Sequence, residues 1–219
     1  MPDPSRVLAG FHDTRSRYRT FNVAVATDSR NRHQACRPEV ERLRAFESLA
    51  SALDDTGLPT RLVHNDAKLD NVLVDTATGR GLCVIDLDTV MPGVAAHDFG
   101  DLVRSSVTGR PEDESDLGTI TIRHDLFREL ASGYLEGAAD WITREERDSL
   151  VEGALVITFE QALRFLTDYL QGDVYYTVKD PGHNLRRARA QIRLLDLRQA
   201  VVGLAAAGKT DCGNHAELA

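Results

Sequence analysis

The chain has 219 residues, with 34 acidic side chains against 26 basic ones, so its formal net charge is −8. Hydrophobic residues make up 42% and charged residues 27% of the chain, which is typical of a globular protein and excludes collagen-like and wholly disordered classes. The acidic balance also argues against general electrostatic binding to nucleic acid or to an anionic membrane.

Signals for targeting and redox chemistry are few. The first six residues contain no apolar core of signal-peptide length. The longest apolar stretch, residues 200–207, is far shorter than the ~20 residues that a membrane helix needs. Cys36, Cys83 and Cys212 are widely spaced and form no CxxC pair, so they predict neither a zinc site nor a disulfide framework. Together these observations favour a cytoplasmic protein.

The N-terminal part is polar and rich in arginine, with a short helix predicted over residues 16–26. A second helix is predicted over residues 39–53, because Pro38 suits the first turn of a helix and apolar residues follow at helical spacing. Gly57 and Pro59 end this helix.

A β-rich centre follows. Two runs rich in β-branched residues, 71–75 and 82–86, flank the turn-prone segment 76–81 and predict a β-hairpin. A hairpin folded symmetrically about its turn places Val72 opposite Ile85.

The C-terminal half is predicted to be helical, and the third of its helices carries a broad apolar stripe that indicates burial. These helices are predicted over residues 98–107, 123–136, 144–170 and 184–206. The predicted fold class is therefore α+β, mainly α, with one compact domain around a small hairpin. The predicted divisions are an N-terminal segment over residues 1–36, the main domain over 37–207 and a flexible tail over 208–219.

Chemically useful residues are densest just before and just after the hairpin. The hairpin brings Asn71 and Asp86 to its open end, next to the loop that holds Asp66 and Lys68. Amide and carboxylate oxygens are ligands suited to Mg²⁺, which completes its shell with water and phosphate oxygens. Asp66 is then left to orient and deprotonate an attacking hydroxyl, while Lys68 offsets charge on a phosphoryl group in transfer.

This pattern, HxDxKxxN followed by a hydrophobic strand that ends in Asp, resembles the catalytic and metal loops of the protein-kinase-like superfamily. The segment from His64 to Asp101 resembles the aminoglycoside phosphotransferase and choline kinase branch of that superfamily. Within the branch, the chain is most similar to the N-acetylhexosamine 1-kinases, and the resemblance extends from about Phe11 to Leu197. The motifs that carry this finer resemblance are FHDT at 11–14, VIDLDTVMP at 84–92, GDVYY at 172–176 and HNL at 183–185.

The resemblance implies the C-terminal lobe of a kinase-like fold, with the hairpin carrying the catalytic loop. It also implies transfer of the ATP γ-phosphate, with Mg²⁺, to a small-molecule hydroxyl such as the anomeric hydroxyl of an N-acetylhexosamine. The expected partners of the protein are a nucleotide and a sugar or amino sugar, with no nucleic acid and no membrane. The site residues that follow are Asp66 and Lys68 for catalysis, Asn71, Asp86 and Asp88 for the metal, Arg164 and Tyr175 for the sugar, and His64 and Asp98 for support of the loop.

One departure from the family pattern concerns the nucleotide. Kinases of this type have an N-terminal lobe that supplies a Gly-rich loop, a strand lysine and a glutamate partner. None of these is visible before Pro38, and no lysine precedes Lys68. We therefore expect a truncated chain, or a partner that supplies the rest, or a protein that no longer transfers phosphoryl groups efficiently. Apolar surface that an N-terminal lobe would otherwise cover would favour self-association of the chain.

Two other functions remain open. The sequence at 86–90 also fits the DxDx[TV] nucleophile motif of haloacid-dehalogenase-type phosphatases. A non-catalytic lobe that binds a sugar or a protein partner is the contrasting hypothesis. Asp88 fits a second metal contact as well as a structural acid.

Several residues also have plain structural interpretations. Glu160, Arg164 and Asp168 are spaced for a salt-bridge ladder on an exposed helix edge. Tyr175 fits the rim of the core as well as a sugar platform, and Asp98 fits a helix cap. The arginines at 186, 187, 189 and 193 indicate a solvated helix face.

Overall fold

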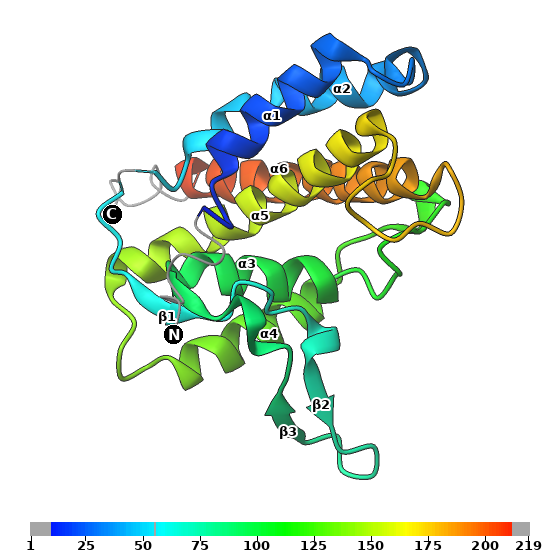
Figure 1. Ribbon diagram of the computed structural model, residues 1–219. Helices are drawn as coiled ribbons and strands as arrows, with labels where there is room; N and C mark the ends of the chain where they lie inside the picture. Colours follow the sequence, from blue (N-terminus) through cyan, green and yellow to red (C-terminus); the bar gives the residue numbers. More distant parts are fainter. Residues whose placement is uncertain (1–9, 55, 212–219) are drawn as a thin grey trace.

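The computed structural model describes residues 10–54 and 56–211, and residues 198–211 by their backbone alone. The described chain is mainly helical, with two small two-stranded sheets (Figure 1). The helices are α1 (Thr14–Thr27), α2 (Arg37–Ala45), α3 (Ala95–Ser106), α4 (His124–Gly137), α5 (Arg144–Gln171) and α6 (His183–Asp211). The strands are β1 (Arg61–Val63), β2 (Val72–Val74), β3 (Gly81–Val84) and β4 (Met91–Gly93).

The predicted helix over residues 39–53 is wrong in its second half. Helix α2 ends at Ala45, and a 3₁₀ helix runs from Glu47 to Ser51. Phe46 leaves the helical conformation at φ −100° and ψ 15°, and its N–H bonds to the carbonyl of Leu43 three residues back. The tighter turn keeps both Phe46 and Ala50 in the core, so the apolar periodicity continues while the helix type changes.

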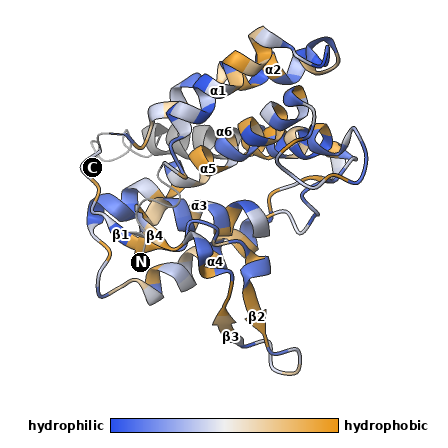
Figure 2. Ribbon diagram, in the orientation of Figure 1, coloured by the Kyte–Doolittle hydropathy of each residue, from blue (hydrophilic) through white to orange (hydrophobic). Residues whose placement is uncertain are grey.

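Helix α5 is the central element of the fold. It begins with a capping box between Thr143 and Glu146 and ends at Gly172, which has φ +104°. Most of its residues are buried, as its apolar stripe predicts. One hydrophobic cluster joins α5 to α1, α2 and α6, and a second joins its N-terminal half to α3 and α4 (Figure 2).

Helices α3 and α5 pack very closely because two glycines lie at their contact. A Cβ added at Gly153 would lie 2.2 Å from the carbonyl oxygen of Ala96, and one at Gly100 would lie 2.5 Å from the carbonyl oxygen of Gly153. Such a close approach fixes the position of α3, whose first turn carries Asp98.

The predicted hairpin is present, but its register differs from the prediction by one residue. Val72 lies opposite Val84 rather than Ile85, with an irregularity between Leu73 and Val74. The turn is set by Asp75, whose side chain accepts from the backbone of the turn and whose N–H bonds to the carbonyl of Arg80. This six-residue closure, rather than symmetry about the turn centre, decides the pairing.

The second sheet pairs β1 with β4, and β4 was not predicted because its sequence, Met-Pro-Gly, has no strand propensity. The β2–β3 hairpin extends away from the helices, and its strands are hydrophobic (Figure 2). Leu73, Leu82 and Val84 are all exposed on it. Self-association through such surface stays a prediction.

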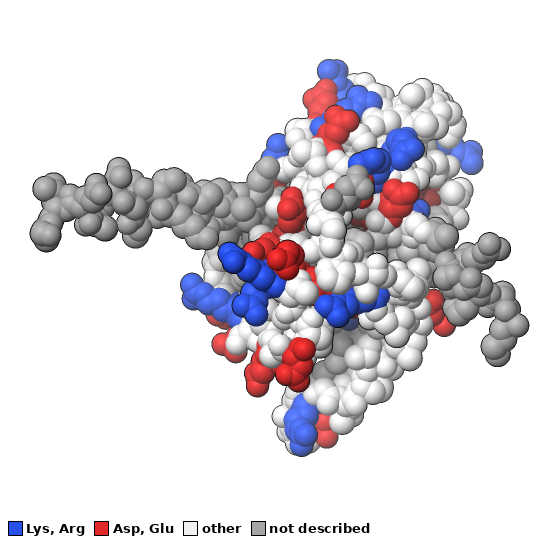
Figure 3. Space-filling view, turned by 90° about the vertical axis from the view of Figure 1, so that its left-hand side faces the viewer, with Lys and Arg blue, Asp and Glu red and all other residues white. Residues whose placement is uncertain are grey.

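Two further predictions concern the ends and the surface. The predicted tail over residues 208–219 begins inside α6, which runs to Asp211, and residues 212–219 lie outside the described chain. Among residues 10–54 and 56–211, no helix combines the length and the apolar character needed to span a membrane. Basic and acidic side chains are interspersed on the face shown in Figure 3, with no basic patch there.

Candidate active site

Helix α3 anchors the loop between β1 and β2 through hydrogen bonds to the loop backbone. The carboxylate of Asp98 accepts hydrogen bonds from the backbone N–H of His64 (2.8 Å) and of Asn65 (2.7 Å). Burial raises the pKa of Asp98, and those two N–H donors only partly offset the effect. Asn65 itself is buried and has φ +62°, a left-handed conformation that needs support from its surroundings.

Asp66, Lys68 and Asn71 form one hydrogen-bonded group, as their spacing predicts. Lys68 Nζ lies 2.6 Å from Asp66 Oδ2, and Asn71 Nδ2 donates to the same oxygen (2.9 Å) and to the Asp66 carbonyl (2.8 Å). Burial alone would raise the pKa of Asp66, but the Lys68 ammonium and the Asn71 amide outweigh it and hold that pKa below its usual value. Asp66 is therefore an ionised carboxylate at neutral pH.

His64 ties this loop to the end of the hairpin. Its Nε2 lies 3.0 Å from the carbonyl of Ile85, and its Nδ1 accepts from the N–H of Asp66 (3.3 Å). Because a carbonyl only accepts, the proton is on Nε2. Thr89 Oγ1 also donates to the His64 carbonyl (2.7 Å). The structure thus places His64 among backbone groups of the loop.

The three residues predicted to bind a metal lie at the base of the hairpin. The N–H of Ile85 bonds to the Asn71 carbonyl (2.9 Å), so Asp86 follows directly beside Asn71. Both hydrogen bonds of the Asn71 side chain use Nδ2, which leaves Oδ1 for a ligand. Asp86 and Asp88 are exposed, and neither carboxylate forms a hydrogen bond or ion pair within residues 10–54 and 56–211.

This donor set fits Mg²⁺ better than a metal that is bound by protein alone. In the described part of the chain, no three His, Cys, Asp or Glu side chains gather closely enough to hold a metal ion. One amide oxygen and one or two carboxylates, completed by water and phosphate oxygens, are the usual environment of Mg²⁺. The Asp-Leu-Asp segment continues into a short 3₁₀ turn and β4, rather than into the helix that normally follows the phosphatase motif.

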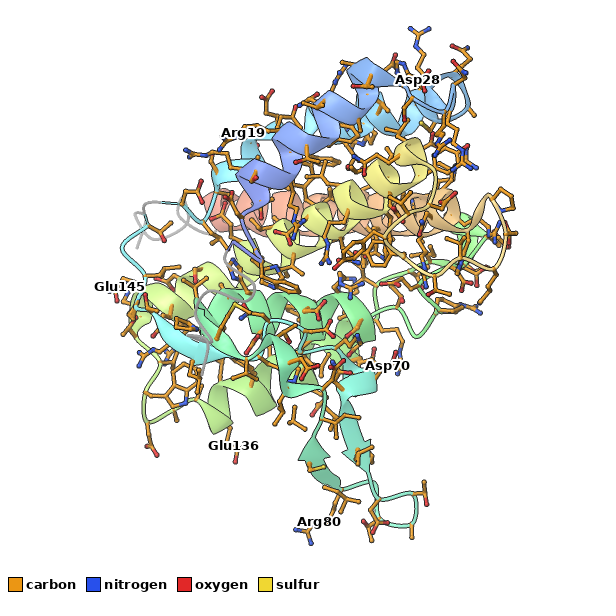
Figure 4. The ribbon with its side chains drawn as sticks, in the orientation of Figure 1. Arg19, Asp28, Asp70, Arg80, Glu136 and Glu145 are labelled. Atoms are coloured by element: carbon orange, nitrogen blue, oxygen red, sulfur yellow. The ribbon has the colours of Figure 1, made fainter. Side chains whose placement is uncertain are left out.

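A cavity of about 600 Å³ opens beside Asp66 and Lys68. Asp70 lies at the base of the hairpin in Figure 4, next to α3, and also lines the cavity, whereas Arg80 marks the far end of the hairpin. The opposite wall consists of side chains from α5, α6 and the segment between them, among them Arg164, Tyr176 and Arg187. The cavity therefore separates the loop that holds Asp66 and Lys68 from a wall of arginines and aromatic rings.

The predicted salt-bridge ladder on α5 is wrong. Glu160 and Asp168 are both buried, and each is bonded to groups outside the helix. Arg164 instead faces the cavity, with its guanidinium 5.3–5.8 Å from the ring centres of Phe11, Tyr175 and Tyr176. Helical spacing brings the three residues to one side of α5, but that side faces the protein and the cavity rather than solvent.

Asp168 holds the segment that carries both tyrosines. One of its oxygens accepts from the N–H of Val174 and of Tyr175 (both 2.8 Å). The other accepts from the N–H of Tyr176 (3.0 Å) and from the buried Asn184 amide (2.8 Å). Tyr175 is largely exposed at the rim of the cavity, whereas the Tyr176 ring packs at a tilt of 54° against Phe165 (4.9 Å between centres).

Sequence reasoning missed one side of the cavity. The prediction of a solvated face holds for Arg186, which pairs with Asp180 at the surface, but is wrong for Arg187. The Arg187 guanidinium lies 5.2 Å from the Phe165 ring centre and 3.6 Å from Glu112, and it lines the cavity with Gln191. Positions 187, 190, 191 and 194 recur at helical spacing, which is the signal that could have placed Arg187 on the inner face.

The family comparison agrees with the loop side of this site. The model of a family described as the phosphotransferase enzyme family matches residues 5–147. The matched span contains the loop between β1 and β2, the hairpin and Asp98, while the wall formed by Arg164, Tyr176 and Arg187 lies beyond it.

Proposed function

Because the chain belongs to the phosphotransferase enzyme family, we propose that it transfers the γ-phosphate of ATP to a hydroxyl of a small sugar. The anomeric hydroxyl of an N-acetylhexosamine is the proposed acceptor. The observation that carries the proposal is the bonded group of Asp66, Lys68 and Asn71 at the edge of a cavity of about 600 Å³. The kinase-like C-terminal lobe is proposed as the scaffold of this site.

In the proposed reaction, Asp66 accepts a hydrogen bond from the attacking hydroxyl, orients it and takes its proton as the new P–O bond forms and the bond to the ADP oxygen breaks. The low pKa of Asp66 makes it a weak base, so orientation of the hydroxyl is its main contribution. The Lys68 ammonium, which already touches Asp66, offsets negative charge on the transferred group.

Asn71 through Oδ1, together with the carboxylates of Asp86 and Asp88, would hold Mg²⁺. When bound there, Mg²⁺ would supply positive charge that offsets part of the negative charge on the nucleotide phosphates. Both carboxylates are exposed and form no hydrogen bond or ion pair within residues 10–54 and 56–211, so their oxygens are available to a metal ion, which supports this assignment.

The opposite wall is proposed to bind the sugar. Arg164 and Arg187 approach the Tyr176 ring at 5.7 and 6.0 Å, so both guanidinium groups are held by aromatic faces with donors left for hydroxyl or carbonyl oxygens. The Tyr175 ring, at the rim, is available to cover an apolar face of the sugar.

A second candidate is a lobe that binds a sugar or a protein partner without transferring phosphate. The exposed apolar side chains of the hairpin favour this alternative, since Leu73, Leu82 and Val84 form surface that a partner would cover.

The direct test is incubation with Mg-ATP and N-acetylglucosamine, followed by measurement of ADP and of the sugar phosphate. Asp66→Asn is expected to lower kcat by about 10²–10⁴-fold. Asp148→Asn is the matched control and should leave kcat unchanged, because Asp148 is an exposed acid on α5 that pairs with Arg144 at the surface. Activity that survives Asp66→Asn would disprove the assignment. Sugar binding without any turnover would favour the binding lobe, and hydrolysis of a phosphate ester that needs Asp86 but not Asp66 would favour the phosphatase.

The sugar wall has its own test. Arg187→Gln is expected to raise the KM for the sugar about tenfold, because a charged hydrogen bond to substrate is lost. Arg186→Gln, on the next residue of the same helix but directed to the surface, should change KM by less than twofold.

A further inference from the structure

His12 connects the segment before α1 to the catalytic loop. Its Nε2 lies 2.9 Å from the carbonyl oxygen of Asn65, and its Nδ1 lies 2.9 Å from Glu160 Oε1 on α5. The His12 and Glu160 side chains are almost fully buried, at 8% and 2% exposed. The other oxygen of Glu160 accepts from Thr14 Oγ1 (2.6 Å). Residues far apart in sequence therefore meet directly beneath the loop.

The hydrogen-bond partners determine where the protons are. A backbone carbonyl can only accept, so Nε2 of His12 carries a proton. Nδ1 faces the carboxylate of Glu160, so this contact also needs a proton between the two atoms. An imidazolium paired with an ionised carboxylate satisfies every partner in this group, including the Thr14 hydroxyl.

The charged groups around His12 agree with this state. Burial by itself would lower the pKa of His12, but the hydrogen bond and the charge of Glu160 outweigh it, so the pKa of His12 is raised. Asp101 and Asp98 on α3 add negative charge nearby, and Arg164 on α5 acts on Glu160. His97, whose ring centre is 4.7 Å away, stays neutral because burial and the charge of His12 lower its pKa to about 3.

We propose that His12, held as an imidazolium by Glu160, is a positioning residue that fixes the backbone of the catalytic loop beside Asp66. The inference rests on the proposed role of Asp66. Asn65 adopts a left-handed backbone conformation, which is unfavourable for a residue other than glycine and therefore needs support from neighbouring groups. Asp98 accepts from the N–H of Asn65 and His12 donates to its carbonyl, so the two peptide groups that flank Asn65 are fixed by different elements, and the second of them leads into Asp66.

The support that His12 gives to the loop, through its contacts with Glu160 and the Asn65 carbonyl, weakens as pH rises. Because the pKa of His12 is raised in the folded protein, its contribution is fully present below the ordinary histidine pKa and is lost as pH rises through the folded value. Loss of that proton sets a lone pair of His12 against the Glu160 carboxylate, or removes the donor to Asn65.

Two substitutions separate the contact of His12 with the Asn65 carbonyl from its contact with Glu160. In His12→Gln, the amide nitrogen takes the place of Nε2 and keeps a donor for the Asn65 carbonyl. In His12→Asn, it takes the place of Nδ1 and keeps only the bond to Glu160. We expect His12→Asn to lower kcat at least about tenfold with a less than threefold change in the sugar KM, and His12→Gln to stay within about threefold of wild type. Glu152→Gln, at an exposed position of α5, is the control.

Two readouts need no turnover, so they separate this inference from the proposed function. In wild type, ¹⁵N signals of His12 should show protonation of both ring nitrogens at pH 7. Amide hydrogen exchange at Asp66 should become faster in His12→Asn than in His12→Gln. A neutral His12 ring at pH 7, or equal exchange and equal kcat in the two variants, would overturn the inference. Confirmed exchange without any phosphoryl transfer would reject the proposed function and leave the positioning role of His12 standing.

Discussion

Replacement of Asp168 by alanine tests how the cavity wall is built. The change leaves four donors without their acceptor: three backbone N–H groups and the Asn184 amide. Val174 and Tyr175 are each 69% exposed, so water can replace the acceptor for their N–H groups. Tyr176 is partly buried and Asn184 is fully buried, and although the Asn184 amide keeps its second hydrogen bond to Asp173 (3.0 Å), one of its hydrogens loses its acceptor. Each buried donor hydrogen without a partner costs about 1–3 kcal/mol. The expected loss is therefore roughly 2–6 kcal/mol, a large part of the stability of a domain of this size.

Urea unfolding at pH 7 measures this loss directly. Asp180→Asn is the matched control, because Asp180 lies between the same two helices but pairs with Arg186 at the surface, where such pairs contribute at most about 1 kcal/mol. Because Asp168 also fixes the backbone of both tyrosines, Asp168→Ala should weaken sugar binding as well. A loss below about 1 kcal/mol would refute the argument, since it would mean that the buried donors find other acceptors.

Three further predictions concern packing, pH and catalysis. Gly153→Ala should cost about 3 kcal/mol in urea unfolding, because its Cβ would lie 2.2 Å from a carbonyl of α3. Gly133→Ala, where nothing lies within 4 Å of the new Cβ, should stabilise by about 0.5–1 kcal/mol; equal effects would contradict the close packing. His97 has its pKa lowered to about 3 by burial and by the charge of His12, so its neutral form stabilises the fold above the ordinary pKa of histidine. That stability is lost as pH falls, by about 2 kcal/mol at pH 5, and His97→Gln should flatten the pH dependence of unfolding between pH 7 and 5. Lys68→Met should raise the pKa of Asp66, because the ammonium that opposes the effect of burial is removed. The acid limb of the kcat–pH profile should then move to higher pH, with kcat about 10²-fold lower. An acid limb that stays in place would contradict the pairing of Lys68 with Asp66.

The hydrogen-bonded group in the loop after β1 could be predicted because its geometry is local. Asp66, Lys68 and Asn71 lie within six residues, and one tight loop is enough to bring them together. The hairpin register was predicted to within one residue for a similar reason. It was not predicted to the residue because the six-residue turn at Asp75 and an irregularity after Leu73 depend on backbone details that periodicity does not contain.

The opposite wall could not be predicted, because periodicity gives the face of a helix but not what covers that face. The spacing of Glu160, Arg164 and Asp168 is the same for an exposed ladder as for a buried row. Each of the two acids is bound by groups outside α5: Glu160 by His12, near the other end of the chain, and Asp168 by Asn184 on the next helix. The inner position of Arg187 follows in the same way from the packing of α6 on α5.

The sequence by itself therefore determined which polar residues gather in the loop after β1 and that a mainly helical chain surrounds a hairpin, since all of these follow from contacts between near neighbours. Only the tertiary structure decided which charges are buried, which arginines face the cavity and which distant histidine supports the loop. These choices depend on the free energy of burying charge, and that energy is set by the elements that pack around each group rather than by the order of residues.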